Sequence, residues 1–359
     1  MFSFLTDHKK YHVLFIQLIK IVIKDDIDYQ KNRTSKIGKF LLIFMMKHCF
    51  LKESFTDFDA LSYAVQDWDI DFSQLDTGPL HADLIQFDGI NSLIAHARFS
   101  RQFDQRGTAP PNFWTFAIFS EKSPPLVWHN KEIDHNYIVI YRPGSEIDCV
   151  SRPGFEVFTF SFSEKVLNQV AHSRSLPDIQ KLLKGGDHII VSEKDLFVTR
   201  RLIRELIQYA DSLELIRKEK VLHSYEEEIL RQIISILARS QPQKNVSPRA
   251  RNRAIKKIKD FLAADPYEPV MVSQLSSIAE VSERTLRYAF LEHYGVSPKT
   301  YLKNFRLNRV RRELWKSDPL ITRVNDIATI WGFWHMGQFA ADYRKLFGEL
   351  PSETLQRGK

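Results

Sequence analysis

The spacing of hydrophobic residues changes along the chain. Between residues 80 and 162, apolar and aromatic residues form short runs such as "NSLIAHARFS", "FWTFAIFS" and "FEVFTFSFS", separated by Gly, Pro or Asn. Short runs rich in β-branched and aromatic residues are typical of strands. Because the runs are closely spaced and punctuated by turn residues, they predict a small barrel or sandwich.

Helical spacing flanks this strand-rich region. "FTDFDALSYAVQDW" (55–68) predicts a helix that Thr56 caps. Further on, a heptad stripe runs through Leu202, Leu206, Tyr209, Leu213 and Ile216, and a second amphipathic run covers 222–236. Two interpretations stay open: these helices pack on their own barrel, or the stripe forms a dimer seam.

The C-terminal third nearly repeats itself after a polar, proline-containing linker at 241–248. "YGVSPKTYL" (294–302) aligns with "FGELPSETL" (347–355) at an offset of 53. Each repeat predicts a short helix, a tight turn and a longer helix, the pattern of a helix-turn-helix unit. The helix between them, "SPKTYLKNFRLNRVRRELWKS", would fix their separation, and its many cations cannot all face a core.

The first 50 residues differ from the rest. Apolar runs such as "YHVLFIQLIKIVIK" are too short to span a membrane. They allow a surface helix, a membrane-touching helix, or an extension ahead of true initiation at Met45 or Met46. We expect the last, so that 1–50 is an extension of uncertain role and the β-rich domain covers 51–240.

Charge divides the chain in the same places. Residues 245–359 carry 20 Lys or Arg against 12 Asp or Glu, whereas 53–244 carry 21 against 28. A basic C-terminal segment beside an acidic middle indicates a module that binds a polyanion, joined to a domain of another kind. Two cysteines without a CxxC pattern favour a reducing compartment, and we expect a cytoplasmic protein with no membrane association.

Catalytic and metal chemistry finds little support. His81, His96, His129 and His135 lack the HxH spacing of a metal site on a strand, and no nucleophile lies in a recognisable pattern with a base. We therefore expect no enzyme activity, metal or cofactor. Two alternative functions for a chain with helix-turn-helix units stay open: an architectural DNA-binding protein without a ligand, and a barrel enzyme tethered to DNA.

The C-terminal residues resemble a known family. Residues 249–355 resemble the DNA-binding domain of the AraC/XylS family of bacterial transcription regulators. The resemblance rests on Leu275, Ser282, Leu286, Phe290, Gly295, Ser297, Pro298 and Leu302 in the first unit, and on Ile327, Ala328, Gly332, Phe333, Phe339, Tyr343, Phe347, Gly348, Pro351 and Ser352 in the second. The stretch "WGFWHMGQFAADYRKLF…PSETL" is similar to the ethanolamine-operon regulator branch.

The resemblance implies an α+β protein in two parts. Its N-terminal β-rich part would be a cupin-like barrel with helices that senses a small molecule or mediates dimerisation. Its all-α C-terminal domain, 249–359, would hold two helix-turn-helix units joined by a linking helix. The implied partners are double-stranded DNA, RNA polymerase, an effector of unknown identity and a second copy of the chain, and the implied role is that of an activator.

The resemblance also places the base readers. In the first unit Arg284 would bind guanine, or Arg284 and Arg287 would contact only phosphate. In the second unit Gln338 would read adenine and Met336 a thymine methyl group, or the unit would sense DNA shape or phosphate position instead. Trp334 and His335 would either contact phosphate or staple the start of the helix. The full set of expected DNA contacts is Ser282, Glu283, Arg284, Thr285, Arg287, Tyr288, Lys299, Arg306, Trp334, His335, Met336 and Gln338.

Aromatic residues on the predicted strands are candidates for an effector pocket. They are Trp114, Phe116, Trp128, Tyr137 and Tyr141. Aromatic residues at alternating strand positions also build ordinary cores, so both interpretations stay open.

Overall fold

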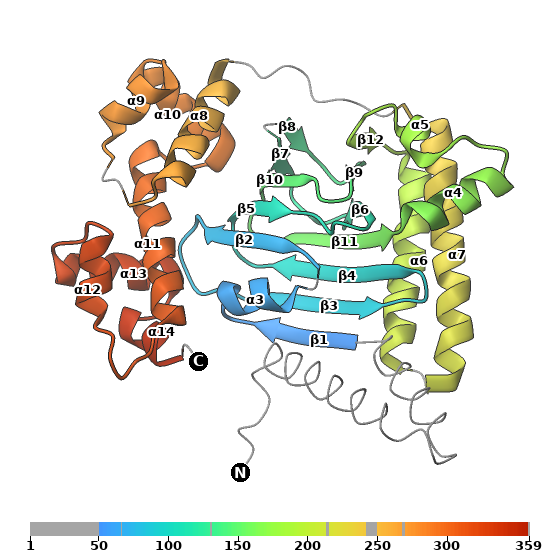
Figure 1. Ribbon diagram of the computed structural model, residues 1–359, viewed down its shortest axis with the longest axis horizontal. Helices are drawn as coiled ribbons and strands as arrows, with labels where there is room; N and C mark the ends of the chain where they lie inside the picture. Colours follow the sequence, from blue (N-terminus) through green and yellow to red (C-terminus); the bar gives the residue numbers. More distant parts are fainter. Residues whose placement is uncertain are drawn as a thin grey trace, which may run out of the picture.

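A computed structural model describes residues 50–65, 67–129, 131–212, 215–241, 250–267 and 270–357. Two β-sheets form its middle, long helices cover one side, and the C-terminal helices lie on the other (Figure 1). The predicted extension 1–50 and the predicted linker 241–248 fall almost entirely outside the described residues.

The larger sheet has seven strands, and every pairing in it is antiparallel. In spatial order the strands are β1 (Phe50–Phe55), β3 (Ala82–Asp88), β4 (Ser92–Phe99), β11 (Phe155–Phe162), β6 (Trp114–Phe119), β9 (Tyr137–Tyr141) and β12 (His188–Ile190). Alternation along β11 explains how this sheet is covered on both faces. Phe158, Phe160 and Phe162 join the helix-side core, whereas Phe155 joins the core between the sheets.

The smaller sheet has five strands and faces the larger one. Its order is β2 (Asp69–Gln74), β5 (Phe103–Thr108), β10 (Glu146–Val150), β7 (Leu126–Trp128) and β8 (Lys131–Ile133). One core joins Leu84 and Val139 of the larger sheet to Phe72, Phe103 and Trp128 of the smaller.

The predicted cupin-like barrel needs a correction. The two sheets are separate and open, since no ladder among the described residues joins their edge strands. A barrel requires that its first and last strands pair, but β1 and β12 lie at opposite edges of the larger sheet. The fold is therefore an α+β sandwich with helices on its outer face.

Helices of the β-rich part follow the predicted segments with two corrections. They are α3 (Phe58–Ala64), α4 (Glu164–Ser173), α5 (Ile179–Leu183), α6 (Glu193–Ser212) and α7 (Leu215–Arg239). The cap of α3 is Asp57 rather than Thr56, because the Asp57 carboxylate accepts hydrogen bonds from the main-chain N–H groups of Asp59 and Ala60.

The second correction concerns the heptad stripe. Leu206 of α6 is 0% exposed and packs with Ile229 and Ile233 of α7 over the larger sheet. The dimer-seam interpretation is therefore wrong for Leu206, and the helices pack on their own sheet. Leu213 and Ile216 belong to the part of the stripe whose side chains lie outside the described residues.

The C-terminal domain consists of two helix pairs on one long helix, with a helix at each end. Its helices are α8 (Ala250–Ala264), α9 (Val272–Ala279), α10 (Glu283–Tyr294), α11 (Pro298–Lys316), α12 (Val324–Ile330), α13 (Met336–Phe347) and α14 (Pro351–Arg357). The linking helix α11 begins at a Ser297 cap with Pro298 in its first turn, an arrangement that favours a helix start.

Candidate DNA-binding surface

The first unit places α10 with one face in its core and one face in solvent. Leu286 and Phe290 are fully buried at the i, i+4 spacing. Arg284, Arg287 and Tyr288 are exposed on the opposite face. The sequence therefore located this face correctly, and its two guanidinium groups are available to bases or phosphates.

The start of α10 is fixed by its own side chains. Ser282 accepts a hydrogen bond from the Thr285 N–H at 3.2 Å, and the two hydroxyl oxygens lie 3.0 Å apart. Both residues thus hold the helix cap, while Glu283 is exposed in the first turn. An N-terminal turn that leaves main-chain N–H groups near solvent is suited to a phosphate.

Tyr288 lies between two arginines from different helices. The guanidinium carbons of Arg284 and of Arg251 in α8 each lie 5.8 Å from the centre of its ring. Arg251 also pairs with Glu292 at 2.9 Å. These contacts orient Arg284 along α10, and Arg251 is a member of this surface that the sequence did not identify.

In the second unit, the four ring-bearing residues before α13 divide into two that pack inward and two that are exposed. Trp331 is buried against Tyr267, with ring centres 4.6 Å apart, and Phe333 contacts Phe339 at 5.1 Å. Trp334 is 73% exposed and His335 is exposed beside it. Both interpretations of Trp334, a phosphate contact and a staple of the helix start, stay predictions.

The N-terminus of α13 is open. His335 occupies the cap position, but its side chain makes no capping hydrogen bond. The first N–H groups of the helix are therefore free of a side-chain cap and lie beside an exposed imidazole. Met336 is half-buried and packs against the core, which limits its reach toward a base.

Gln338 is exposed but has a partner on its own helix. Asp342 accepts hydrogen bonds from Gln338 and from Lys303, the latter at 2.7 Å. Burial raises the pKa of Asp342, but these hydrogen bonds and the Lys303 charge outweigh burial and lower it. The Gln338 amide is thus held in place on the exposed face.

The two residues of α11 that were expected to contact DNA differ in exposure. Lys299 is exposed in the first turn. Arg306 turns inward: it donates to the main-chain oxygen of Val270 at 3.1 Å, and burial lowers its pKa. This bond holds the linking helix to the segment before α9, and the expected contact of the half-buried Arg306 with DNA stays a prediction.

The exposed faces of α10 and α13, here called the reading surface, do not include every cation of the C-terminal domain. Lys259, Arg311 and Arg312 are paired with carboxylates of that part, at Asp148, Asp57, Asp59 and Asp71. Exposed cations of the second unit that were not among the expected contacts include Arg323, which precedes α12, and Arg344 and Lys345 of α13. Periodicity within α13 would have placed the last two on its solvent side.

The five aromatic residues expected in an effector pocket are divided between two cores, one on each face of the larger sheet. Trp114 and Phe116 are in the helix-side core. Trp128, Tyr137 and Tyr141 belong to the core between the sheets, where Trp128 and Tyr141 contact each other at 4.9 Å. The five do not line one cavity.

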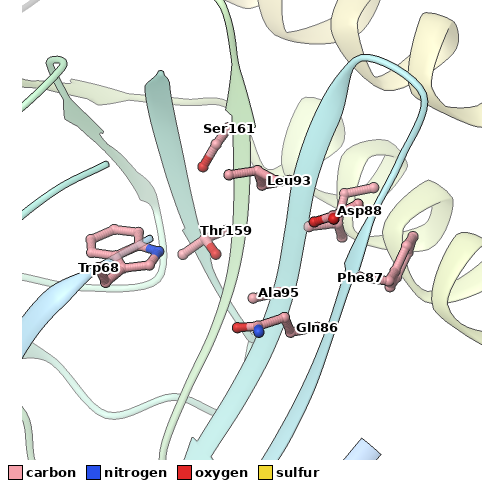
Figure 2. A pocket seen from close by; sticks show the side chains of 9 residues that line it. Trp68, Gln86, Phe87, Asp88, Leu93, Ala95, Thr159 and Ser161 are labelled. Atoms are coloured by element: carbon pink, nitrogen blue, oxygen red, sulfur yellow. The ribbon is translucent and has the colours of Figure 1, made fainter. Parts of the chain in front are cut away.

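A hollow does open beside that inner core. It is lined by Trp68, Gln86, Phe87, Asp88, Leu93, Ile94, Ala95, Thr159 and Ser161. Figure 2 shows Trp68 facing Thr159 and Ala95, with Phe87 pointing away. Its volume of about 10 Å³ has room for one water molecule.

Among the described residues, no three side chains of His, Cys, Asp or Glu gather in a way that would hold a metal ion. No helix in the same part of the chain combines the length and apolar character that a membrane crossing requires.

Two helix-turn-helix units with exposed second helices, carried on one linking helix, define a double helix-turn-helix protein. A family model described as "Helix-turn-helix domain" matches residues 275–357. The "XylDLEGF operon transcriptional activator 2" of Pseudomonas putida is 34% identical over 108 residues, which cover 30% of this chain and 69% of that protein. The chain belongs to the AraC/XylS family of transcription regulators.

Other similar proteins cover different shares of the chain. The "Probable thc operon regulatory protein" of Rhodococcus erythropolis is 38% identical over 97 residues, 27% of this chain and 29% of that protein. The solved structure of the AraC-like transcriptional activator CuxR is 12% identical, covers 77% of this chain and 99% of its own, and has a TM-score of 0.41. The chain spans only 29% to 53% of the length of the first five curated relatives that it matches. The closer resemblance to ethanolamine-operon regulators stays a prediction.

Proposed function

We propose that this protein is a sequence-specific DNA-binding transcription regulator, and an activator. The observation that carries the proposal is the repeated unit, in which a buried face fixes α10 and α13 while the opposite faces present Arg284, Arg287 and Gln338 to solvent. Each helix would enter the major groove of one duplex, with the basic residues around it neutralising phosphates. The names of the relatives as operon activators support the sign of regulation and RNA polymerase as a partner.

The β-rich part would act as the sensor in this proposal. Small and polar side chains, among them Ala95, Thr159 and Ser161, line the inner face of the larger sheet near Trp68. A small-molecule effector would enter between the sheets there and would have to open the hollow, since its present volume is about 10 Å³. A second copy of the chain would be a partner through a surface other than Leu206.

A selection tests the DNA-binding claim. Full-length protein is incubated with a library of randomised duplex DNA at fixed salt, and the bound sequences are determined. The proposal predicts enrichment of a site with two separated elements. Uniform recovery of the library would favour the architectural alternative, in which DNA is bound without a base preference.

A further inference from the structure

The linking helix α11 is bound along its length by the smaller sheet and the segments around it. Asn308 accepts from the main-chain N–H of Gln74 at 2.8 Å and donates to its carbonyl oxygen at 2.9 Å. Asn304 donates to the carbonyl oxygen of Leu75 at 2.8 Å. Both amides are buried, so α11 satisfies main-chain groups at the end of β2 that the sheet leaves unpaired.

Arg311 is the centre of this contact. It is 2% exposed and reaches Asp57 Oδ2 at 2.7 Å and Asp59 Oδ2 at 2.6 Å, both at the start of α3. It also lies 3.2 Å from Glu349, which follows α13 in the second unit. Burial lowers the pKa of Arg311, but the carboxylates beside it dominate and raise it, so the guanidinium stays charged. Burial raises the pKa of Asp57, but the Arg311 charge outweighs burial and lowers it, whereas at Asp59 burial outweighs the arginines and raises the pKa.

Two aromatic rings, one from the β-rich part and one from the second unit, lie against the Arg311 guanidinium. Its central carbon lies 4.3 Å from the ring centre of Phe58 in α3 and 5.4 Å from that of Phe347 in α13. The two rings also contact each other at 5.9 Å. Arg311 therefore joins three parts: the linking helix, the β-rich part and the second helix-turn-helix unit.

The second unit has further fixed points on the same segment. The carbonyl oxygen of Leu346, near the end of α13, accepts from the Gln74 amide at 2.7 Å and from the Gly78 N–H at 3.0 Å. A Cβ on Gly348 would meet Pro79 at 2.9 Å, so glycine is required at this close approach. We call α10 and α13, the second helices of the two units, the recognition helices. The C-terminal end of α13 is thus held against residues 74–79.

The first unit is held at a different place. Lys259 of α8 pairs with Asp148 of β10. The Gln102 amide donates to the Tyr294 carbonyl oxygen at the end of α10, at 2.8 Å. Leu75, Val127 and Val150 of the β-rich part are members of the first unit's core.

These contacts bind the ends of both recognition helices and leave their N-terminal faces exposed. Arg284, Arg287 and Trp334 remain open to solvent while the C-terminal ends of α10 and α13 are anchored. Between the units themselves, the described residues contribute α11 and the Tyr267–Trp331 contact. Docking on the β-rich part thus adds rigidity without covering the reading surface.

We propose that Arg311, with Asp57 and Asp59, is a positioning residue that fixes the second recognition helix relative to the first, and so sets the spacing of the two half-sites that the protein accepts. This inference rests on the proposed function. Half-site spacing on a duplex is a geometric property of the protein that reads it, because each added base pair moves and rotates the second site. A rigid pair of helices accepts one spacing, whereas a pair joined only by α11 and small contacts accepts several.

The test uses the full chain and the site recovered by selection. A panel of duplexes has base pairs inserted or deleted between the two elements, and affinities are measured by fluorescence anisotropy at one salt concentration. Wild-type protein should lose about tenfold in affinity for a change of one base pair, comparable with the cost of one mismatch. The triple variant Arg311→Met, Asp57→Asn, Asp59→Asn removes the three charges together. Arg311→Met alone would take the shared cation from two buried carboxylates and leave Asp57 only Arg357 at 3.6 Å and Asp59 only Arg312 at 3.3 Å.

The triple variant should bind the whole panel with affinities that differ by less than about threefold, while the base preference within each element is unchanged. Lys316→Met, an exposed cation on the same helix, should keep the wild-type profile. Should the triple variant fail to fold, Asp59→Asn is the substitute, since its amide oxygen still accepts from Arg311, and it should broaden the profile partially.

A folded triple or Asp59→Asn variant with the wild-type spacing profile would overturn the inference. A wild-type protein that selects no two-element site would overturn the proposed function instead, and the inference with it. The spacing profile separates positioning from mere stability, because a loss of folded protein weakens binding to every duplex equally.

Discussion

The Lys259 ammonium lies 3.2 Å from Nε2 of His293, and both residues are buried where α8 and α10 meet the smaller sheet. Lys259 can only donate, so Nε2 of His293 accepts and the imidazole is neutral. Burial, followed by the positive charge of Lys259, lowers the pKa of His293 to about 3, against the opposing carboxylates of Asp148 and Asp104.

This pair predicts that acid destabilises the folded chain. Between the ordinary pKa of His and the depressed folded value, the unfolded state binds the extra proton, so stability rises with pH and is lost as pH falls. From pH 7.5 to 5.5 the His293 contribution to the free energy of unfolding should fall by about 1.4 kcal/mol. Urea unfolding at the two pH values measures it.

His293→Gln is the control for this effect. Glutamine still accepts a hydrogen bond from Lys259 but does not titrate, so the variant should lose about 1.4 kcal/mol less than wild type over the same interval. His129, whose pKa is also lowered by burial, and Glu226, whose pKa burial raises, titrate in both proteins. Their contributions to the pH dependence of stability therefore cancel in the comparison. Equal losses in the two proteins would contradict a neutral, buried His293.

Leu206 should matter for folding and not for association. Because it is fully buried between α6, α7 and the larger sheet, Leu206→Ala should lower the free energy of unfolding by about 2–5 kcal/mol. The exposed neighbour Gln208→Ala should change it by less than about 0.5 kcal/mol. Sedimentation at conditions where both variants are folded should match wild type, and a shift toward monomer in Leu206→Ala alone would revive the dimer seam.

Lys299 and Arg306 should differ in their effect on DNA binding. Lys299 is exposed at the start of α11, so Lys299→Ala should reduce the slope of log affinity against log salt by about 0.9. Arg306→Ala should lower stability and leave that slope unchanged, since its guanidinium is bonded to Val270. A slope change for Arg306→Ala as large as that for Lys299→Ala would show that Arg306 also reaches phosphate.

His335 should contribute to affinity without regard to sequence. It lies at the uncapped start of α13, where a phosphate would meet both the imidazole and the first N–H groups. His335→Ala should weaken binding to specific and scrambled duplexes by similar factors, as measured by anisotropy titrations on both. A loss confined to the specific duplex would make His335 a base reader.

The repeat and its helices were predictable because their periodicity is local. Leu286 and Phe290 lie one turn apart on α10, and the spacing alone places them on the buried face and Arg287 on the exposed face. The small side chains Thr159 and Ser161 alternate with phenylalanines along β11, so a signal for a hollow inner face was present in the sequence.

Contacts between distant segments were not predictable in this way. The sequence shows an excess of cations on 298–316 and aspartates near 57–71, but not that Arg311 pairs with Asp57 across more than 250 residues. The split of Phe116 and Tyr141 between two cores depends on how their strands lie in register, which alternation within one strand does not define.

The central claim is that α10 and α13 each read one element of a two-element site. Selections from randomised duplexes with Arg284→Ala and, separately, Gln338→Ala measure it directly. Arg284→Ala should cost about 1–3 kcal/mol on the wild-type site and relax base preference in one element, and Gln338→Ala should relax preference only in the other. Variants that relax the same element, or that leave both elements as sharply specified as in wild type, would contradict the account.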